Sequence, residues 1–152
     1  MSTIFVQLPD GSKKELSEGS SALDLASGIG RRLADAATGA RINGEAAGLA
    51  TTLQDGDTVE ILTFDTREGQ DVFRHSAAHL MAAAIMRLRP KTKLAIGPSI
   101  EDGFYYDIDT PHTFVPEDLE KIQAEMEKIV KADYPIERMA MSREEALRFF
   151  GE

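Results

Sequence analysis

Short apolar runs separated by turn residues fill the first part of the chain, residues 1–63. The run IFVQL at residues 4–8 and a second run at residues 12–16 flank a Pro-Asp-Gly turn. Asp-Gly between two such runs predicts a β-hairpin, because glycine tolerates the positive φ that a tight turn requires.

Helical spacing follows the hairpin and then gives way to strand signals. Helices are predicted over residues 22–29 and 31–37, and strands over residues 41–45 and 58–62. The first helix has its apolar residues at intervals of three, at Leu23, Ala26 and Ile29. A hairpin, a helix, a strand, a turn and a final strand in this order are typical of a β-grasp fold.

The second part of the chain begins with a polar stretch at residues 63–70, which we interpret as a linker that continues into a helix. That helix is predicted over residues 67–88, because a proline shortly after it disfavours helical backbone at the preceding residue. Short strands are expected at residues 93–96 and 103–108, and the second of them is rich in aromatic residues.

Two more helices are predicted towards the end of the chain. The first covers residues 117–132, directly after a proline, and carries an apolar stripe formed by Leu119, Ile122, Met126, Ile129 and Val130. A strand is expected at residues 135–141. Ser142 then caps the last helix, and Glu145 completes a capping box.

The predicted architecture is α+β in two units. Residues 1–63 form the β-grasp unit, and residues 64–152 form a long helix on a small, mostly antiparallel sheet with two further helices. A composition of 42% hydrophobic and 28% charged residues is that of a folded protein. No run approaches the roughly 20 apolar residues of a membrane span, and no secretory signal is recognisable, so we expect a cytoplasmic protein.

Charge and cysteine content narrow the classes of chemistry. Cysteine is absent, which excludes disulfides, a thiolate nucleophile and cysteine-ligated zinc within this sequence. The 17 basic and 26 acidic residues give a net charge of −9, which argues against a general polyanion binder. A local basic patch is still compatible with this balance.

The sharpest local feature is the pair His75 and His79, which lie about 40° apart around a helix and so face the same space. Such imidazoles can bind one metal, share a water, or act as acid and base. The zinc-protease motif requires Glu after the first His, where this chain has Ser76, and a third ligand, for which His112 is the only histidine left. We therefore expect no metal site. The plain alternative is a pair of helix histidines with structural hydrogen bonds.

A second feature is the alternation of four cations at Arg87, Arg89, Lys91 and Lys93. Cations at this density can meet a nucleic-acid backbone. Cations at a helix C-terminus also complement the helix dipole, which is the structural alternative.

A third feature is the aromatic run GFYYD at residues 103–107, preceded by Ile96-Gly97-Pro98. Aromatic rings can stack on a nucleobase, but they also pack within sheets and cores. The sequence contains neither a glycine-rich phosphate loop with lysine nor a serine nucleophile flanked by glycines.

In their order along the chain, these features resemble the amino-terminal region of bacterial threonyl-tRNA synthetases. The first unit resembles a TGS domain, a β-grasp unit shared with certain GTPases and stringent-response enzymes, through LPDG at 8–11, ALDLA at 22–26, ING at 42–44 and DGD at 55–57. The second unit resembles the start of the editing domain, through RHSAAHL at 74–80, AIGP at 95–98 and GFYYD at 103–107.

The resemblance implies hydrolysis of seryl-tRNA(Thr), which a ligase for threonine makes by mistake. Serine lacks one methyl group of threonine, and one such group is worth only about 1–3 kcal/mol of discrimination, so a second sieve is needed. The resemblance places His75 and His79 at the hydrolytic site, where they orient or activate water and the terminal ribose. It places Tyr106 and Gly97 in the substrate pocket. With tRNA(Thr) as partner, the four cations become candidates for backbone contacts.

The departures from the family pattern are equally informative. The family site is completed by a Cys-x-x-x-His motif with further Lys and Asp residues, and this sequence has no cysteine. The catalytic core with its ATP, magnesium and zinc sites is missing, as is the anticodon-binding domain. We therefore expect a truncated piece of a homodimeric ligase. The fragment itself is expected to be a monomer without cofactor, to lack charging activity, and to carry half an editing site.

Two other functions fit the same residues. One is a non-catalytic TGS module that binds RNA or protein. The other is an independent hydrolase that uses the two histidines as metal ligands, which requires a bound metal and a third ligand.

Overall fold

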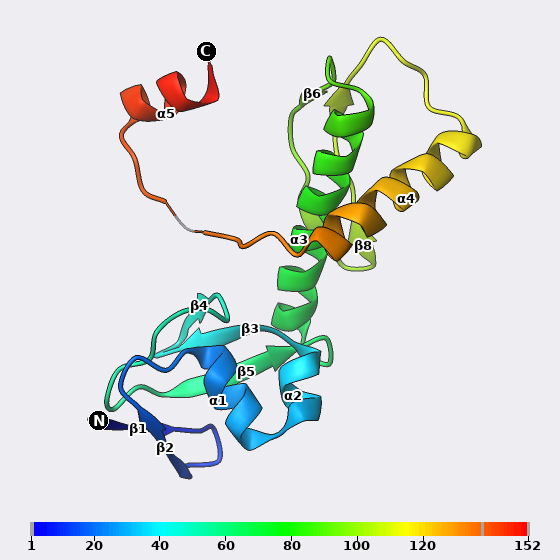
Figure 1. Ribbon diagram of the computed structural model, residues 1–152. Helices are drawn as coiled ribbons and strands as arrows, with labels where there is room; N and C mark the ends of the chain where they lie inside the picture. The colour runs from blue at the N-terminus through cyan, green and yellow to red at the C-terminus, as the bar shows by residue number, and fades with distance from the viewer. Residues whose placement is uncertain (1, 138, 152) are drawn as a thin grey trace.

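A computed structural model describes residues 2–137 and 139–151 (Figure 1). A sheet with two short helices forms one end, and a long helix leads from it to a second group of helices and short strands (Figure 1). Among the described residues, no helix is both long and apolar enough to cross a membrane.

The first unit contains five strands. β1 (Thr3–Gln7) pairs antiparallel with β2 (Lys13–Ser17), which confirms the predicted hairpin. β3 (Ala37–Ile42) pairs antiparallel with both β4 (Glu45–Ala47) and β5 (Val59–Thr63). The predicted strand at this place therefore begins earlier than its sequence pattern indicated, directly after the second helix.

The hairpin and the three-stranded sheet are joined into one mixed sheet. Gln7 forms a parallel bridge with Thr58, and the amide of Gln7 donates to the carbonyl of Asp57 at 2.8 Å. Because Thr58 leads directly into β5, the strand order becomes β2-β1-β5-β3-β4. This order, with one parallel pair at its centre, is the arrangement of a β-grasp sheet.

Helices α1 (Ala22–Ile29) and α2 (Arg31–Ala36) complete the first unit. The predicted apolar face of α1 is wrong at Leu23 and Ile29, which are 41% and 39% exposed, because the sheet covers the neighbouring side that carries Leu25. The core combines side chains from the hairpin, α1, β3, β5 and the loop before β5, namely Ile4, Val6, Ala22, Leu25, Ala40, Leu53 and Val59.

The long helix α3 (Arg67–Leu88), which confirms the prediction, is fixed to the sheet at its first turn. Gly69 is buried so closely against β5 that a Cβ at this position would lie 1.9 Å from the carbonyl oxygen of Thr63. In addition, the guanidinium of Arg41 on β3 contacts the carboxylate of Glu68 on α3. The linker between the two units is therefore short and tightly packed.

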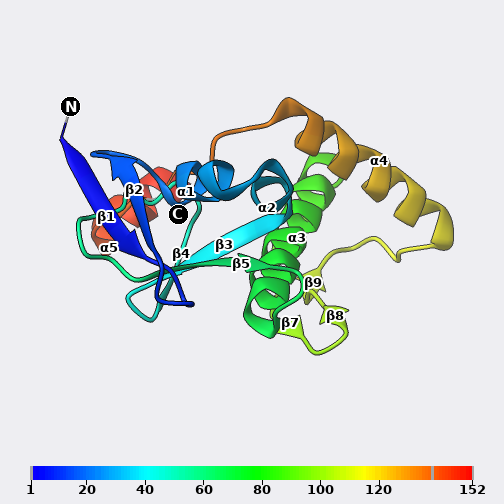
Figure 2. The same cartoon turned by 90° about the horizontal axis from the view of Figure 1, so that it is seen from below.

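Four two-residue strands lie beyond α3. β6 (Lys93–Leu94) pairs antiparallel with β9 (Ile108–Asp109), and β7 (Ser99–Ile100) pairs antiparallel with β8 (Gly103–Phe104). Figure 2 shows β7 and β8 beside α3, with which both are in contact. The single strand predicted at residues 103–108 is wrong, because residues 105–107 pass from one ladder to the other.

Helix α4 (Pro116–Ala132) packs on α3 and confirms the predicted helix. Its inner side places Ile122 against Ile85 of α3 in a small buried cluster. Two members of the predicted apolar stripe, Leu119 and Val130, are instead 65% and 63% exposed. The stripe is thus wider than the surface that α3 covers.

The end of the chain is extended and then helical. The strand predicted at residues 135–141 is wrong for the described part of this segment, where Ile136 is 95% exposed and no ladder forms. Helix α5 (Arg143–Phe150) follows, with the predicted capping box between Ser142 and Glu145.

Candidate functional site

Two histidines face one another on the exposed side of α3. The Nε2 atoms of His75 and His79 are 3.0 Å apart, and their ring centroids are separated by 4.6 Å at an interplanar angle of 80°. Helical spacing of four residues brings both rings to one face. Both side chains are exposed, so a reactant in solution can approach them.

The contact between the two Nε2 atoms limits how protons are shared. One nitrogen must donate and the other must accept, because two N–H groups pointing at one another would repel. The pair therefore holds one proton between His75 and His79. When this contact opens, a free ring nitrogen can accept a proton from a water or hydroxyl group, and the imidazolium formed can then donate that proton as an acid.

The predicted pocket residues Gly97 and Tyr106 are in direct contact. A Cβ added at Gly97 would lie 2.3 Å from Cδ2 and 2.4 Å from Cε2 of the Tyr106 ring. Only glycine lets the ring lie this close to the backbone, so the two residues form one wall. Within the described residues, no hydrogen bond joins this wall to the histidine pair.

Arg74, which precedes the first histidine, holds the adjacent hairpin against α3. Its guanidinium donates to the carbonyl oxygens of Ile100 at 3.1 Å and Glu101 at 2.5 Å. A pocket of about 340 Å³ lies here, lined by Arg67, Gln70, Asp71, Arg74, Ser99, Ile100 and Glu101. The β7–β8 hairpin is therefore positioned by the same helix that carries the histidine pair.

The four predicted backbone-binding cations differ in their surroundings. Arg87 is 3.4 Å from a carboxylate oxygen of Glu125 and lies over the ring of Tyr134 at 5.6 Å. Arg89 is part of a polar network at the end of α3, whereas the side chains of Lys91 and Lys93 are exposed.

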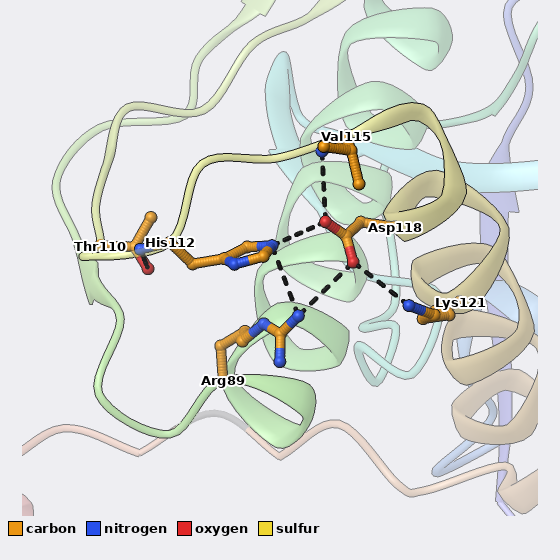
Figure 3. A network of polar contacts seen from close by, with 6 residues as sticks. All are labelled: Arg89, Thr110, His112, Val115, Asp118 and Lys121. Atoms are coloured by element: carbon orange, nitrogen blue, oxygen red, sulfur yellow. Dashed lines mark hydrogen bonds and ion pairs between the residues drawn. The ribbon is translucent and has the colours of Figure 1, made fainter.

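The polar network is centred on the carboxylate of Asp118 in the first turn of α4 (Figure 3). Its oxygens lie 2.6 Å from Nε2 of His112, 3.4 Å from Nη2 of Arg89 and 3.5 Å from Nζ of Lys121. The backbone amide of Val115 also donates to it at 3.2 Å, which caps the helix.

These contacts govern the protonation of Asp118. The hydrogen bond from His112, followed by that from the amide of Val115, lowers the pKa of Asp118 to about 2. Its side chain is only 7% exposed, so a charge buried here requires such partners. The network ties the end of α3, the loop before α4 and α4 itself together.

Comparisons with known proteins agree with this fold. The TGS domain family matches residues 4–63, which span the mixed sheet and its helices. The threonine–tRNA ligase of Carboxydothermus hydrogenoformans is 53% identical over 98% of this chain, that of Symbiobacterium thermophilum 50% over 99%, and that of Clostridioides difficile 50% over 98%. The chain therefore carries a TGS domain and corresponds to the N-terminal part of bacterial threonine–tRNA ligases.

The match covers only part of these relatives. The chain spans 24% of the Carboxydothermus hydrogenoformans ligase and 23% of each of the other two. The TGS domain takes up the first part of this shared region, and the histidine pair, the Gly97–Tyr106 wall and the Asp118 network all lie after it.

Sequence reasoning missed the network that follows the TGS domain. His112 attracts attention only as a third histidine, and its partner Asp118 is indistinguishable in the sequence from other acidic residues at helix starts. The available signal was the position of Asp118 three residues after Val115, where a carboxylate caps a helix. The described residues contain no group of three or more His, Cys, Asp or Glu side chains that could hold a metal ion.

Proposed function

We propose that the chain is the N-terminal region of a threonine–tRNA ligase and contributes half of a site that hydrolyses seryl-tRNA(Thr). The observation that supports this most directly is the His75–His79 pair, exposed on α3 with its Nε2 atoms 3.0 Å apart. It occurs within a stretch about 50% identical to bacterial threonine–tRNA ligases. The domain division proposed with it is a TGS domain at residues 1–63 and a partial editing domain at residues 64–152.

The proposed reaction is attack by water on the aminoacyl ester. One histidine accepts a proton from the water as its oxygen bonds to the ester carbonyl carbon. The imidazolium formed in this step then donates the proton, directly or through the other ring, to the ribose oxygen as the ester bond breaks, which releases serine and free tRNA. The proton taken from the water is thus the one returned to the ribose oxygen, so no further group on this chain is needed to supply it.

The wall formed by Gly97 and Tyr106 is proposed to line the substrate pocket. A ring packed directly on the backbone is held rigidly, and a rigid wall can exclude the additional methyl group of threonine. The remaining walls are proposed to come from the longer protein, because the family motif Cys-x-x-x-His has no counterpart in this sequence.

The cofactors of the whole ligase are proposed to bind outside this region. Threonyl-tRNA synthetases use ATP, magnesium and zinc, but this sequence has no cysteine, and its described His, Asp and Glu side chains are not grouped to hold a metal. We accordingly assign no step to a metal here. We also propose tRNA(Thr) as partner, a homodimeric full-length ligase, a monomeric fragment and a cytoplasmic location.

A non-catalytic binding module is the second candidate. The buried core of the TGS domain draws only on residues before α3, from Ile4 to Val59. Such a domain can bind RNA or protein without any contribution from the histidine pair.

The test is deacylation of seryl-tRNA(Thr) by this chain and by a longer protein that includes the next part of the relatives. We expect turnover only in the longer protein, lowered about 10²- to 10⁴-fold by His75→Ala or His79→Ala. Ser76→Ala is the matched control, because Ser76 lies on the same turn and its hydroxyl donates to the carbonyl of Val72, on the same helix.

Three results would contradict the proposal. Turnover by the chain alone would show a complete site within these residues. Turnover in the longer protein that survives both histidine substitutions would assign the chemistry to other groups. Absence of turnover in both proteins would favour the binding module.

A further inference from the structure

Residues 93–109 form one long hairpin that is interrupted in its middle. The β6–β9 ladder continues beyond its two paired rungs, because the amide of Ala95 donates to the carbonyl of Asp107 at 3.0 Å. The β7–β8 ladder closes the tip of the hairpin. The wall formed by Gly97 and Tyr106 lies between the two ladders, so its position depends on how both ends of the hairpin are held.

The hairpin is attached to α3 at both ends. Its base follows α3 after a short turn, in which the amide of Thr92 donates to the carbonyl of Arg89 at 3.0 Å. Its tip is bound by Arg74, whose Nη1 donates to two neighbouring carbonyl oxygens, at 3.1 Å for Ile100 and 2.5 Å for Glu101. Because both acceptors belong to the backbone, this contact fixes the path of the chain at the tip.

The lengths of α3 and of the hairpin place Gly97 at the level of the histidine pair. Arg74 and Arg89 are about 22 Å apart along the helix axis, at a rise of about 1.5 Å per residue. The hairpin arm of residues 93–100 spans at most about 23 Å, so it runs along α3 nearly extended. Gly97 is then about 13 Å from the base of the arm, and His79 is about 15 Å from the end of the helix. Figure 1 shows the same arrangement, with β6 near the C-terminal end of α3 and β8 further towards its start.

The guanidinium of Arg74 is also held by the linker between the two units. Its Cζ lies 5.8 Å from the centroid of the Phe64 ring, which is within the range of a cation–π contact. The Phe64 ring meets that of Phe73 edge-to-face at 5.3 Å, and the carbonyl of Phe64 accepts a hydrogen bond from the side chain of Gln70 at 2.9 Å. Arg74 therefore has a fixed ring on one side and the hairpin tip on the other.

We infer that Arg74 is a positioning residue that sets the selectivity of the proposed editing site for serine over threonine. It lies next to the first histidine on α3, whereas Gly97 and Tyr106 reach the site only through the hairpin that Arg74 binds. One methyl group allows only about 10- to 200-fold discrimination, so a small shift of the wall is sufficient to lose it. The selectivity role rests on the proposed function, while the anchoring of the hairpin rests on the structure alone.

Amide hydrogen exchange, followed by nuclear magnetic resonance in this chain, tests the anchoring. Arg74→Ala is expected to speed exchange in β7 and β8 about tenfold and to leave the amides of the TGS core unchanged, because only the hairpin tip loses its contact with α3. Arg67→Ala is the matched control. Arg67 lies about two turns earlier on α3 and lines the same pocket as Arg74 with an exposed side chain.

Deacylation by the longer protein tests the selectivity. Arg74→Ala is expected to lower kcat/KM for seryl-tRNA(Thr) about tenfold and to leave that for threonyl-tRNA(Thr) nearly unchanged, because the displaced wall no longer excludes the methyl group. The ratio of the two values therefore falls about tenfold. A partial loss of folding would lower both values together and leave the ratio unchanged. Arg67→Ala is expected to keep both values.

Arg74→Lys separates geometry from charge. Lysine keeps the positive charge but lacks the planar guanidinium that bonds to two carbonyls and stacks on a ring. The ratio is expected to stay reduced about fivefold or more in this variant. Recovery of the full ratio would mean that Arg74 acts through its charge, for example on the tRNA, and would overturn the inference.

The remaining outcomes distinguish this inference from the proposed function. Unchanged exchange in β7 and β8 of Arg74→Ala would overturn the anchoring and leave the histidine pair to its own test. Faster exchange with an unchanged serine-to-threonine ratio would overturn the selectivity role. Absence of turnover in the unsubstituted longer protein would contradict the proposed function and the selectivity role with it, while the exchange rates would still decide whether Arg74 anchors the hairpin.

Discussion

The TGS domain and the region after it contain similar proportions of structured chain but bury their apolar side chains very differently. In the TGS domain, Leu25, Leu53 and Val59 are between 0% and 1% exposed. In the second region, the buried cluster is Ala84, Ile85 and Ile122, with partly buried neighbours around it. Large apolar side chains elsewhere in this region are mostly exposed, namely Leu119, Val130, Tyr134, Ile136, Met139, Phe149 and Phe150.

The difference shows what each region needs in order to fold. The TGS sheet packs on its own helix, so its apolar side chains are covered by other residues of the same domain. This domain has about 60 residues, a size at which small domains can fold alone. The second region has one helix pair and four two-residue strands, which offer little surface to cover its apolar side chains. Its order therefore depends more on polar contacts, above all on the Asp118 network.

The largest effect is expected from a cavity in the TGS core. Leu25→Ala removes a side chain that is 1% exposed, so it is expected to lower the free energy of unfolding by about 2–5 kcal/mol. Leu119→Ala removes the same atoms from a site that is 65% exposed and is expected to change the free energy of unfolding by less than about 0.5 kcal/mol. Urea titration followed by circular dichroism measures both.

Tyrosine fluorescence, as a second probe, shows in which of the two regions stability is lost. The chain has no tryptophan and three tyrosines, at positions 105, 106 and 134, all of them after the TGS domain. Tyrosine fluorescence therefore reports on the second region alone. A Leu119→Ala effect as large as that of Leu25→Ala would refute the contrast between the two regions.

An intermediate effect on the second region is expected from pH, through the carboxylate of Asp118. The folded pKa of Asp118, about 2, is below its ordinary value near 3.9, so the unfolded chain takes up the proton first as the pH falls. The stabilisation is therefore complete above about pH 4 and is lost as the pH falls towards 2. Tyrosine-detected urea titrations between pH 5 and 2 measure it.

Asp118→Asn isolates this contribution from the other carboxylates. The variant is expected to be less stable than the natural protein at pH 5, and the difference is expected to shrink as the pH falls. Asp102→Asn changes an exposed carboxylate that lies outside the network and serves as control. A difference that stays constant across this range would mean that Asp118 does not act through its charge.

Local signals in the sequence were sufficient for most elements of the TGS domain and for helices α3, α4 and α5. The hairpin follows from Asp-Gly, and the last helix from Ser142 and Glu145, because each signal lies within a few residues. The predicted face of α1 was wrong because spacing of three residues does not reveal which side the sheet will cover. The early start of β3 was missed because its first residues, Ala37 to Ala40, are small and carry no clear strand signal.

The elements of the second region were harder to predict from the sequence, and the reason also explains why this region is loosely packed. Its strands are two residues long and pair with residues between 3 and 16 positions away, so neither the division of residues 103–108 nor the absence of a ladder near Ile136 has a local signal. The candidate site was partly predictable, since helical spacing alone pairs His75 with His79. The Asp118 network was not, because it joins three segments that only the fold brings together.

The smallest expected effect compares one capping motif placed in both regions. Ser21 and Asp24 form a capping box at the start of α1, and Ser142 and Glu145 form the same box at the start of α5. Ser21→Ala is expected to lower the free energy of unfolding by about 1 kcal/mol, because α1 is part of the TGS core and cannot fray without opening it. Ser142→Ala removes a chemically identical cap from a helix with no buried residue, so it is expected to leave the urea midpoint unchanged and only to speed amide exchange within α5. Equal shifts of the midpoint for both variants would mean that α5 is packed on the rest of the protein in solution, and the two regions would then be stabilised in the same way.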